Sequence, residues 1–188
     1  ENELRKMLHT AVSQPGPVAI RYPRGTGTGC PLDETSPPLE IGRSEVLKTG
    51  DDLLILALGR PVNDALTVAQ DLEKEGISAT VVDCRFAKPL DRDRILDLAG
   101  KIPRILTVEE NVLQGGFGSA VLECLMDAGL SGLTVKRLGI PDTFVEHGPQ
   151  ALLRAKYGLD AAGIAQAARE LAKHEIRISK SETNSKFG

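Results

Sequence analysis

Two arginines three positions apart, Arg21 and Arg24, form the most distinctive group of side chains that could do chemistry. They stand in the run Arg-Tyr-Pro-Arg-Gly, where a short apolar segment, residues 18–20, ends and a loop begins. Pro23 restricts the backbone before Arg24, and the glycine that follows can turn without a Cβ. A guanidinium held on a stiff turn can make parallel hydrogen bonds to two phosphate oxygens. An ion pair between domains is the alternative role for such an arginine.

A second candidate is the run of residues 109–118, EENVLQGGFG, which follows a predicted strand and opens a predicted helix. Glycines at a helix N-terminus attract anions. The dinucleotide-binding spacing Gly-x-Gly-x-x-Gly fails, however, because Val121 stands where the third glycine belongs. Glu109 and Glu110, just before the turn, also argue against a phosphate there. We therefore favour close backbone packing against a neighbouring domain or subunit.

Glu109 and Glu110 could also serve as a general acid/base pair. Adjacent residues of a strand point to opposite faces of the sheet, so these two carboxylates do not readily share one site. The run of residues 83–91, DCRFAKPLD, ends a strand at the sheet edge where open α/β folds bind ligands. Such residues more often cap the next helix, as Asp91 would, or pair with each other. His147 has no evident acidic or nucleophilic partner, which favours a structural or solvent-facing role.

Cysteine and histidine usage predicts neither a metal site nor a disulfide framework. Cys30, Cys84 and Cys124 lie far apart and form no Cys-x-x-Cys motif. The three histidines do not cluster with cysteines or carboxylates at the spacing of metal ligands. Unpaired, scattered thiols fit a reducing compartment, so we expect a cytoplasmic protein.

Composition excludes several classes of partner. The 188 residues include 23 Lys+Arg and 26 Asp+Glu, for a net charge of −3, and these charges are interspersed. This gives no electrostatic footprint for nucleic acid. No apolar run approaches the roughly 20 residues that a membrane span needs. The chain begins without Met inside a predicted helix, so we expect a piece of a longer protein.

Apolar periodicity predicts alternating strands and helices along most of the chain. The predicted strands are residues 18–20, 53–58, 79–86, 104–108 and 133–138, and the predicted helices are 2–13, 62–75, 89–98, 117–128, 149–157 and 160–174. Such alternation favours parallel strands joined by right-handed crossovers. We therefore predict an α/β fold, an open and mostly parallel sheet with helices on both faces. Residues 41–48 alternate apolar and polar side chains, which predicts one antiparallel edge strand.

Several motifs, taken together and in this order, resemble a known family. They are GPVAIRYPRG, PLEIG, TVEEN…GGFGSAV, LGIPDTFVEHG and YGLDAAGI. The set resembles the C-terminal part of the 1-deoxy-D-xylulose-5-phosphate synthases, thiamine-diphosphate enzymes of the transketolase-like type, over roughly residues 1–172. General transketolases and 2-oxoacid dehydrogenase β subunits share the fold but match these motifs less well.

The resemblance implies an organisation and a reaction. Residues 1–25 would end the pyrimidine-binding domain, 26–43 would be a linker, 44–175 would form a transketolase C-terminal domain, and 176–188 a disordered tail. The whole enzyme would be a cytoplasmic homodimer that uses thiamine diphosphate and Mg²⁺. It would condense pyruvate with D-glyceraldehyde 3-phosphate, with loss of CO₂, for isoprenoid, thiamine and pyridoxal synthesis. Arg24 matches the arginine that grips the substrate phosphate, and Arg21 is a secondary candidate.

Departures from the family pattern limit what this chain can do alone. The Gly-Asp-Gly…Asn motif for Mg²⁺ and diphosphate is absent, and the run Gly50-Asp51-Asp52 does not match it. The family's cofactor-activating glutamate and active-site histidines would lie upstream of Glu1. We therefore expect no catalytic, cofactor-binding or metal-binding residue here, and we expect the chain alone to be inactive without its N-terminal domains.

Three other hypotheses remain open. The chain could be the C-terminal domain of another transketolase-like enzyme or a split transketolase half. It could be a 2-oxoacid dehydrogenase β subunit, which would need a partner chain. It could also be an assembly module without catalysis, for which the Arg24 side chain would be dispensable.

Overall fold

A five-stranded sheet forms the centre of the part of the chain that the structure describes. This computed structural model describes the backbone of residues 1–184 and the side chains of residues 1–173. The strands are β1 (Glu45–Lys48), β2 (Leu53–Leu58), β3 (Ala79–Asp83), β4 (Arg104–Val112) and β5 (Thr134–Ile140), in the spatial order β1-β3-β2-β4-β5. All neighbours pair in parallel except β1, which pairs antiparallel with β3. The predicted mostly parallel sheet with one antiparallel edge strand is confirmed.

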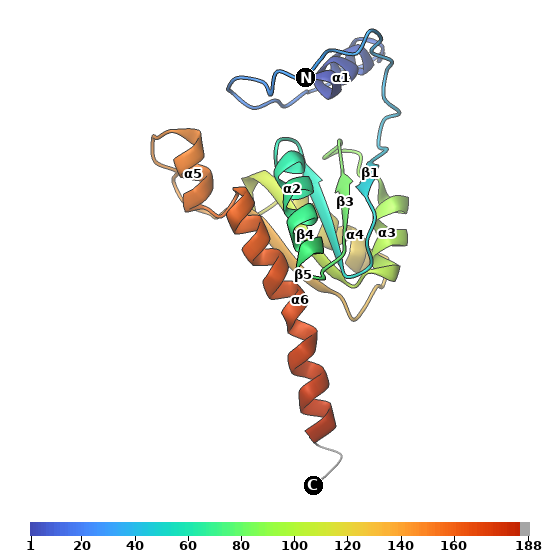
Figure 1. Ribbon diagram of the computed structural model, residues 1–188. Helices are drawn as coiled ribbons and strands as arrows, with labels where there is room; N and C mark the ends of the chain where they lie inside the picture. The colour runs from blue at the N-terminus through green and yellow to red at the C-terminus, as the bar shows by residue number, and fades with distance from the viewer. Residues whose placement is uncertain (185–188) are drawn as a thin grey trace.

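Helices cover both faces of this sheet, as predicted (Figure 1). The covering helices are α2 (Pro61–Lys74), α3 (Arg92–Lys101), α4 (Phe117–Asp127) and α6 (Ala161–Asn184), whereas α1 (Asn2–Val12) and α5 (Gln150–Lys156) lie outside the two cores. Side chains of α2 and α6 fill one apolar core, and those of α3 and α4 fill the other. The alternation of β2 explains the two cores, because Leu53 and Ile55 face the first and Leu54 and Leu56 the second. A strand that is buried on both faces has apolar residues at every position, and this continuous apolar run is the pattern that predicted β2.

The end of the chain differs from the prediction. Helix α6 continues to Asn184, into the predicted disordered tail of residues 176–188. The physical reason is that neither glycine nor proline occurs between Gly163 and Gly188 to end the helix. Residues 185–188 of the predicted tail lie outside the described residues. None of the helices described here is both long and apolar enough to span a membrane.

The predicted strand of residues 18–20 is wrong. These residues form no strand, and Val18 is 49% exposed. A strand needs a neighbouring ladder to satisfy its backbone groups, and the described chain supplies no partner here. Residues 31–39 instead run beside α1 in the same direction. Pro31 accepts a hydrogen bond from Asn2, and Leu39 donates one to Thr10.

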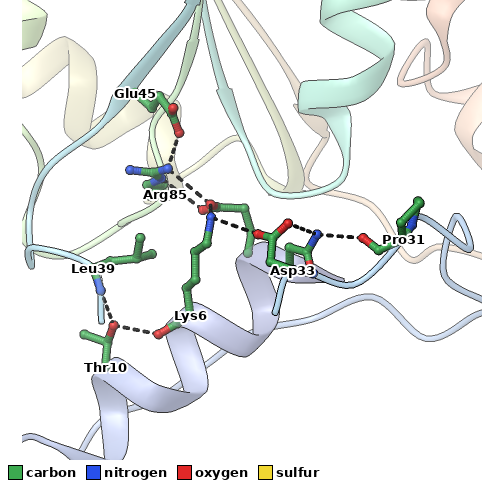
Figure 2. A network of polar contacts seen from close by, with 9 residues as sticks. Lys6, Thr10, Pro31, Asp33, Leu39, Glu45 and Arg85 are labelled. Carbon is green, nitrogen blue, oxygen red and sulfur yellow. Dashed lines mark hydrogen bonds and ion pairs between the residues drawn. The ribbon is translucent and has the colours of Figure 1, made fainter. Parts of the chain in front are cut away.

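One arginine joins α1 to the sheet (Figure 2). Arg85 follows β3, and its guanidinium donates to both carboxylate oxygens of Glu3 at 3.0 and 3.1 Å. It also pairs with Glu45 of β1. Arg85 has a φ of +53°, which ends β3 at Asp83, three residues earlier than predicted. The same bend directs the side chain toward α1, so the N-terminal segment (residues 1–40) is fastened above the carboxyl edge of the sheet.

Asp83 lies beneath this junction and is poorly solvated. Its Oδ1 accepts a hydrogen bond from the backbone N–H of Arg85 at 2.9 Å. Burial, with smaller contributions from the neighbouring Glu3 and Glu45, raises the pKa of Asp83 to about 6, against the opposing effects of the Arg85 backbone N–H and guanidinium. Because the folded-state pKa lies above the ordinary value of 3.8, the stability linked to this proton is present below about pH 4. It is lost as the pH rises through about 6.

Asp83→Asn should therefore stabilise the chain at high pH only. The asparagine keeps the acceptor for Arg85 and removes the buried charge, so the free energy of unfolding should rise by about 1–3 kcal/mol at pH 8. At pH 4 the variant and the parent chain should be equally stable. Urea unfolding at both pH values measures this, with the exposed Asp51→Asn as control. A difference that does not change with pH would contradict the assignment.

Candidate functional site

The candidate site lies on the loop that carries Arg24, beside the carboxyl edge of the sheet. Arg21 and Arg24 are both exposed. The main-chain oxygen of Arg24 accepts a hydrogen bond from Nε2 of Gln150, the first residue of α5, at 2.5 Å. Gly25 follows with a φ of +152°, a conformation that side-chain-bearing residues rarely adopt. The loop therefore presents an exposed guanidinium from a main chain that α5 holds in place.

The helix N-terminus at residues 116–118, which we considered and disfavoured as an anion site from the sequence, is occupied by the carboxylate of Glu109. Both oxygens of this buried carboxylate accept backbone hydrogen bonds at 2.8 Å, from the N–H groups of Phe117 and Gly118. These are unpaired donors of the first turn of α4, where the helix dipole also favours a negative charge. Glu109 thus occupies the position that a bound phosphate would need, which explains why acidic residues precede this turn.

The glycines of the turn allow the start of α4 to lie close against β4, and they do not form a phosphate-binding loop. A Cβ on Gly116 would lie 2.1 Å from the main-chain oxygen of Val112 and 2.6 Å from Glu109. A Cβ on Gly118 would lie 2.6 Å from Thr107 Oγ1. Real Cβ atoms are not found this close to other atoms, so larger residues would displace α4 from the sheet. The close approach is therefore made to the chain's own strand β4, whereas the prediction was packing against a neighbouring domain or subunit.

Glu110 has a different role from Glu109, and the two carboxylates do not meet. Glu110 pairs with Arg154 of α5, whereas Glu109 caps α4. Neighbouring residues of a strand point to opposite faces of the sheet, so Glu109 and Glu110 do not form a general acid/base pair. Arg154 also donates from Nη2 to Oε1 of Gln150 at 3.0 Å. Sequence analysis missed Gln150 and Arg154, although their i, i+4 spacing on a helix is the one that brings side chains together.

The remaining candidates mostly have structural roles. Asp91 accepts from the backbone of Arg94 as the cap of α3 and, at 2.8 Å, from the backbone and hydroxyl of Ser44. Burial alone would raise the pKa of Asp91, but these hydrogen bonds together lower it. The predicted capping by Asp91 is thus confirmed, whereas Asp91 and Arg85 pair with residues outside this run. His147 is exposed on the loop before α5.

The described residues do not fit thiamine diphosphate or Mg²⁺. Within residues 1–173, no group of three His, Cys, Asp or Glu side chains could hold a metal ion. The glycine-rich helix N-terminus that could bind a diphosphate is filled by Glu109. A cofactor diphosphate placed there would meet a buried negative charge.

Fold and sequence together place the chain in a family. The model of the transketolase C-terminal domain matches residues 42–164, and the chain belongs to this family. It is 59% identical to 1-deoxy-D-xylulose-5-phosphate synthase 1 of Geobacter sulfurreducens over 89% of this chain and 26% of that protein. It is 49% identical to the 1-deoxy-D-xylulose-5-phosphate synthase of Desulforudis audaxviator over 95% of this chain and 28% of that protein.

A solved structure is also similar. It is described as a split-gene transketolase in an inactive β4 tetramer. It is 40% identical, covers 72% of this chain and 44% of its own, and has a TM-score of 0.66. The chain therefore spans about a quarter of the length of the synthases that it matches and less than half of the split transketolase chain.

Glu109→Gln should weaken the attachment of α4 to the sheet. An amide has one acceptor oxygen, so its NH₂ group would face one of the two backbone N–H donors. We expect a loss of about 2–4 kcal/mol in the free energy of unfolding, since bonds to a charged acceptor contribute about 1.5–3 kcal/mol each. Urea unfolding near pH 7 measures this, with Glu123→Gln on the exposed side of α4 as control. Equal stability of the two variants would contradict the cap.

Proposed function

We propose that this chain provides the C-terminal part of a 1-deoxy-D-xylulose-5-phosphate synthase. The observation that carries the proposal is the exposed side chain of Arg24, whose main chain is held beside the carboxyl edge of the sheet. This arginine occurs in a chain that is 59% identical to such a synthase. The whole enzyme condenses pyruvate with D-glyceraldehyde 3-phosphate with loss of CO₂, a step toward isoprenoids, thiamine and pyridoxal. This assignment places residues 1–25 at the end of the pyrimidine-binding domain and residues 44–175 in the C-terminal domain.

The task proposed for this chain is recognition of the acceptor's phosphate. A guanidinium binds a phosphate dianion through charge-assisted, often bidentate hydrogen bonds. Arg24 is exposed, so it is free to meet a ligand that enters from other domains. Arg21, also exposed and on the same loop, adds positive charge nearby. Pyruvate carries no phosphate, so these arginines should discriminate between the two substrates.

The other parts of the whole enzyme follow from the same proposal. Thiamine diphosphate and Mg²⁺ are bound by domains outside this chain, since the described residues offer them no cradle. The whole enzyme is a homodimer in the cytoplasm. The burial of Cys84 and Cys124, both free thiols, is consistent with a reducing compartment.

A split transketolase half is the second candidate, favoured by the similar solved structure. In that case a separate partner chain supplies the cofactor domains, and the donor is a ketose rather than pyruvate. The two candidates differ in a simple observable. A synthase consumes pyruvate and releases CO₂, whereas a transketolase transfers a two-carbon unit without releasing CO₂.

Arg24→Ala should impair use of the phosphorylated substrate alone. The test uses a chimera in which this chain replaces the matching part of the Geobacter sulfurreducens synthase. Losing a charge-assisted contact of about 1.5–3 kcal/mol should raise the KM for glyceraldehyde 3-phosphate roughly 10- to 150-fold. The KM for pyruvate should change less than twofold. Steady-state kinetics with each substrate varied in turn measures both.

The matched control is Lys101→Ala, which removes a positive charge from α3. It should leave both KM values unchanged. Equal effects of Arg24→Ala on the two substrates would refute the phosphate assignment. Unchanged kinetics in Arg24→Ala would instead support an assembly module. A chimera that uses ketose donors and ignores pyruvate would favour the transketolase alternative.

The isolated chain should not bind the cofactor. Titration calorimetry of the chain with thiamine diphosphate and Mg²⁺ should show no heat of binding, because Glu109 fills the anion-binding helix N-terminus. The chimera, titrated identically, should bind both. Tight binding by the isolated chain would contradict the proposal that other domains bind the cofactor.

A further inference from the structure

A chain of three side chains connects the sheet to the main chain of Arg24. The first link is Gln150, whose Nε2 donates to the oxygen of Arg24, 126 positions earlier in the sequence. The described side chains make no hydrogen bond or ion pair with the Arg24 guanidinium. Within this chain, the loop position of Arg24 is therefore set by its backbone, and Gln150 holds that backbone.

The orientation of the Gln150 amide is determined by its two neighbours. The oxygen of Arg24 is an acceptor only, so it requires the amide nitrogen. The Arg154 guanidinium is a donor only, so it requires the amide oxygen, which it meets at 3.0 Å. Both ends of the amide are used, and neither can be satisfied by the reversed orientation.

Arg154 is in turn fixed from the sheet. Its Nε donates to Glu110 of β4, and the two side chains are only 15% and 25% exposed. They border a hollow of about 170 Å³ whose walls include Ile140, Val145 and Leu153. Apolar walls reduce competition from water, so this ion pair orders Arg154 more firmly than a surface pair would. α5 lies at the edge of the sheet on the side of the N-terminal segment (Figure 1).

We propose that Glu110, Arg154 and Gln150 form a positioning relay that holds the main chain of Arg24 where its guanidinium meets the substrate phosphate. This inference rests on the proposed function. When an arginine on a free loop binds a phosphate, ordering the loop costs conformational entropy and weakens the binding. A backbone that is already anchored avoids part of this cost. Gln150 is thus a positioning residue, and its effect is specific to the phosphorylated substrate.

The opposing interpretation is that these bonds merely attach α5 to the N-terminal segment. A purely structural attachment would change stability without changing the kinetics for one substrate. Two readouts separate these cases: the KM for each substrate in the chimera, and the rate of trypsin cleavage after the exposed Arg24 in the chain itself. The second readout does not depend on activity.

The decisive variant is Gln150→Met, which has a similar length and removes both hydrogen bonds. In the chimera, the KM for glyceraldehyde 3-phosphate should rise about 3- to 10-fold, while the KM for pyruvate and kcat stay within twofold. Arg24→Ala combined with Gln150→Met should be no worse than Arg24→Ala alone, because the relay acts only through Arg24. Arg154→Met should act in the same direction. Gln166→Met, which removes a contact with Glu170 on α6, is the matched control and should change nothing.

In the chain itself, Gln150→Met should accelerate trypsin cleavage after Arg24, because the backbone there loses its anchor, and Gln166→Met should not. Unchanged cleavage after Arg24, an unchanged KM for glyceraldehyde 3-phosphate, or an additive double variant would overturn the relay while leaving the role of Arg24 intact. Equal effects of Arg24→Ala on both substrates would instead overturn the proposed function, and with it the relay.

Discussion

The ion pair of Arg85 with Glu3 determines where the N-terminal segment stands. It joins residues 82 positions apart and places α1 above the carboxyl edge of the sheet. Without it, the loop that carries Arg24 would be attached to the α/β part of the chain through fewer contacts, among them Gln150. Arg85 can reach Glu3 because its backbone leaves the strand conformation directly after β3. The position of the candidate site therefore depends on this ion pair together with the Gln150 contact, and both join segments that are distant in sequence.

Charged residues at the ends of neighbouring strands each fasten a different element. Arg85 after β3 holds α1, Glu109 of β4 holds α4, and Glu110 of β4 holds α5 through Arg154. Open α/β folds commonly bind ligands at this edge, yet here the charges are satisfied within the chain. These charges support neighbouring elements, and the exposed arginines of the N-terminal segment are the groups that we propose for a ligand.

The sequence predicted the α/β unit well and the long-range contacts poorly. Residues 53–58 form β2 as predicted, because an apolar run buried on both faces is recognisable by composition alone. The strand predicted at residues 18–20 failed because strand formation depends on a partner, which periodicity does not reveal. The sequence showed that an acidic residue such as Glu109 is unfavourable beside an anion site. Only the fold shows that the Glu109 carboxylate itself occupies that site. Gln150 and Arg154 were missed because a main-chain partner 126 residues away leaves no local pattern.

The central claim is that Arg24 recognises a phosphate. The most direct test compares glyceraldehyde 3-phosphate with unphosphorylated D-glyceraldehyde as acceptors for the chimera, with pyruvate saturating. We predict that kcat/KM strongly favours the phosphorylated acceptor, and that Arg24→Ala removes most of this preference while leaving D-glyceraldehyde turnover unchanged. A preference that survives Arg24→Ala would contradict it, because the phosphate would then be bound by residues outside this chain.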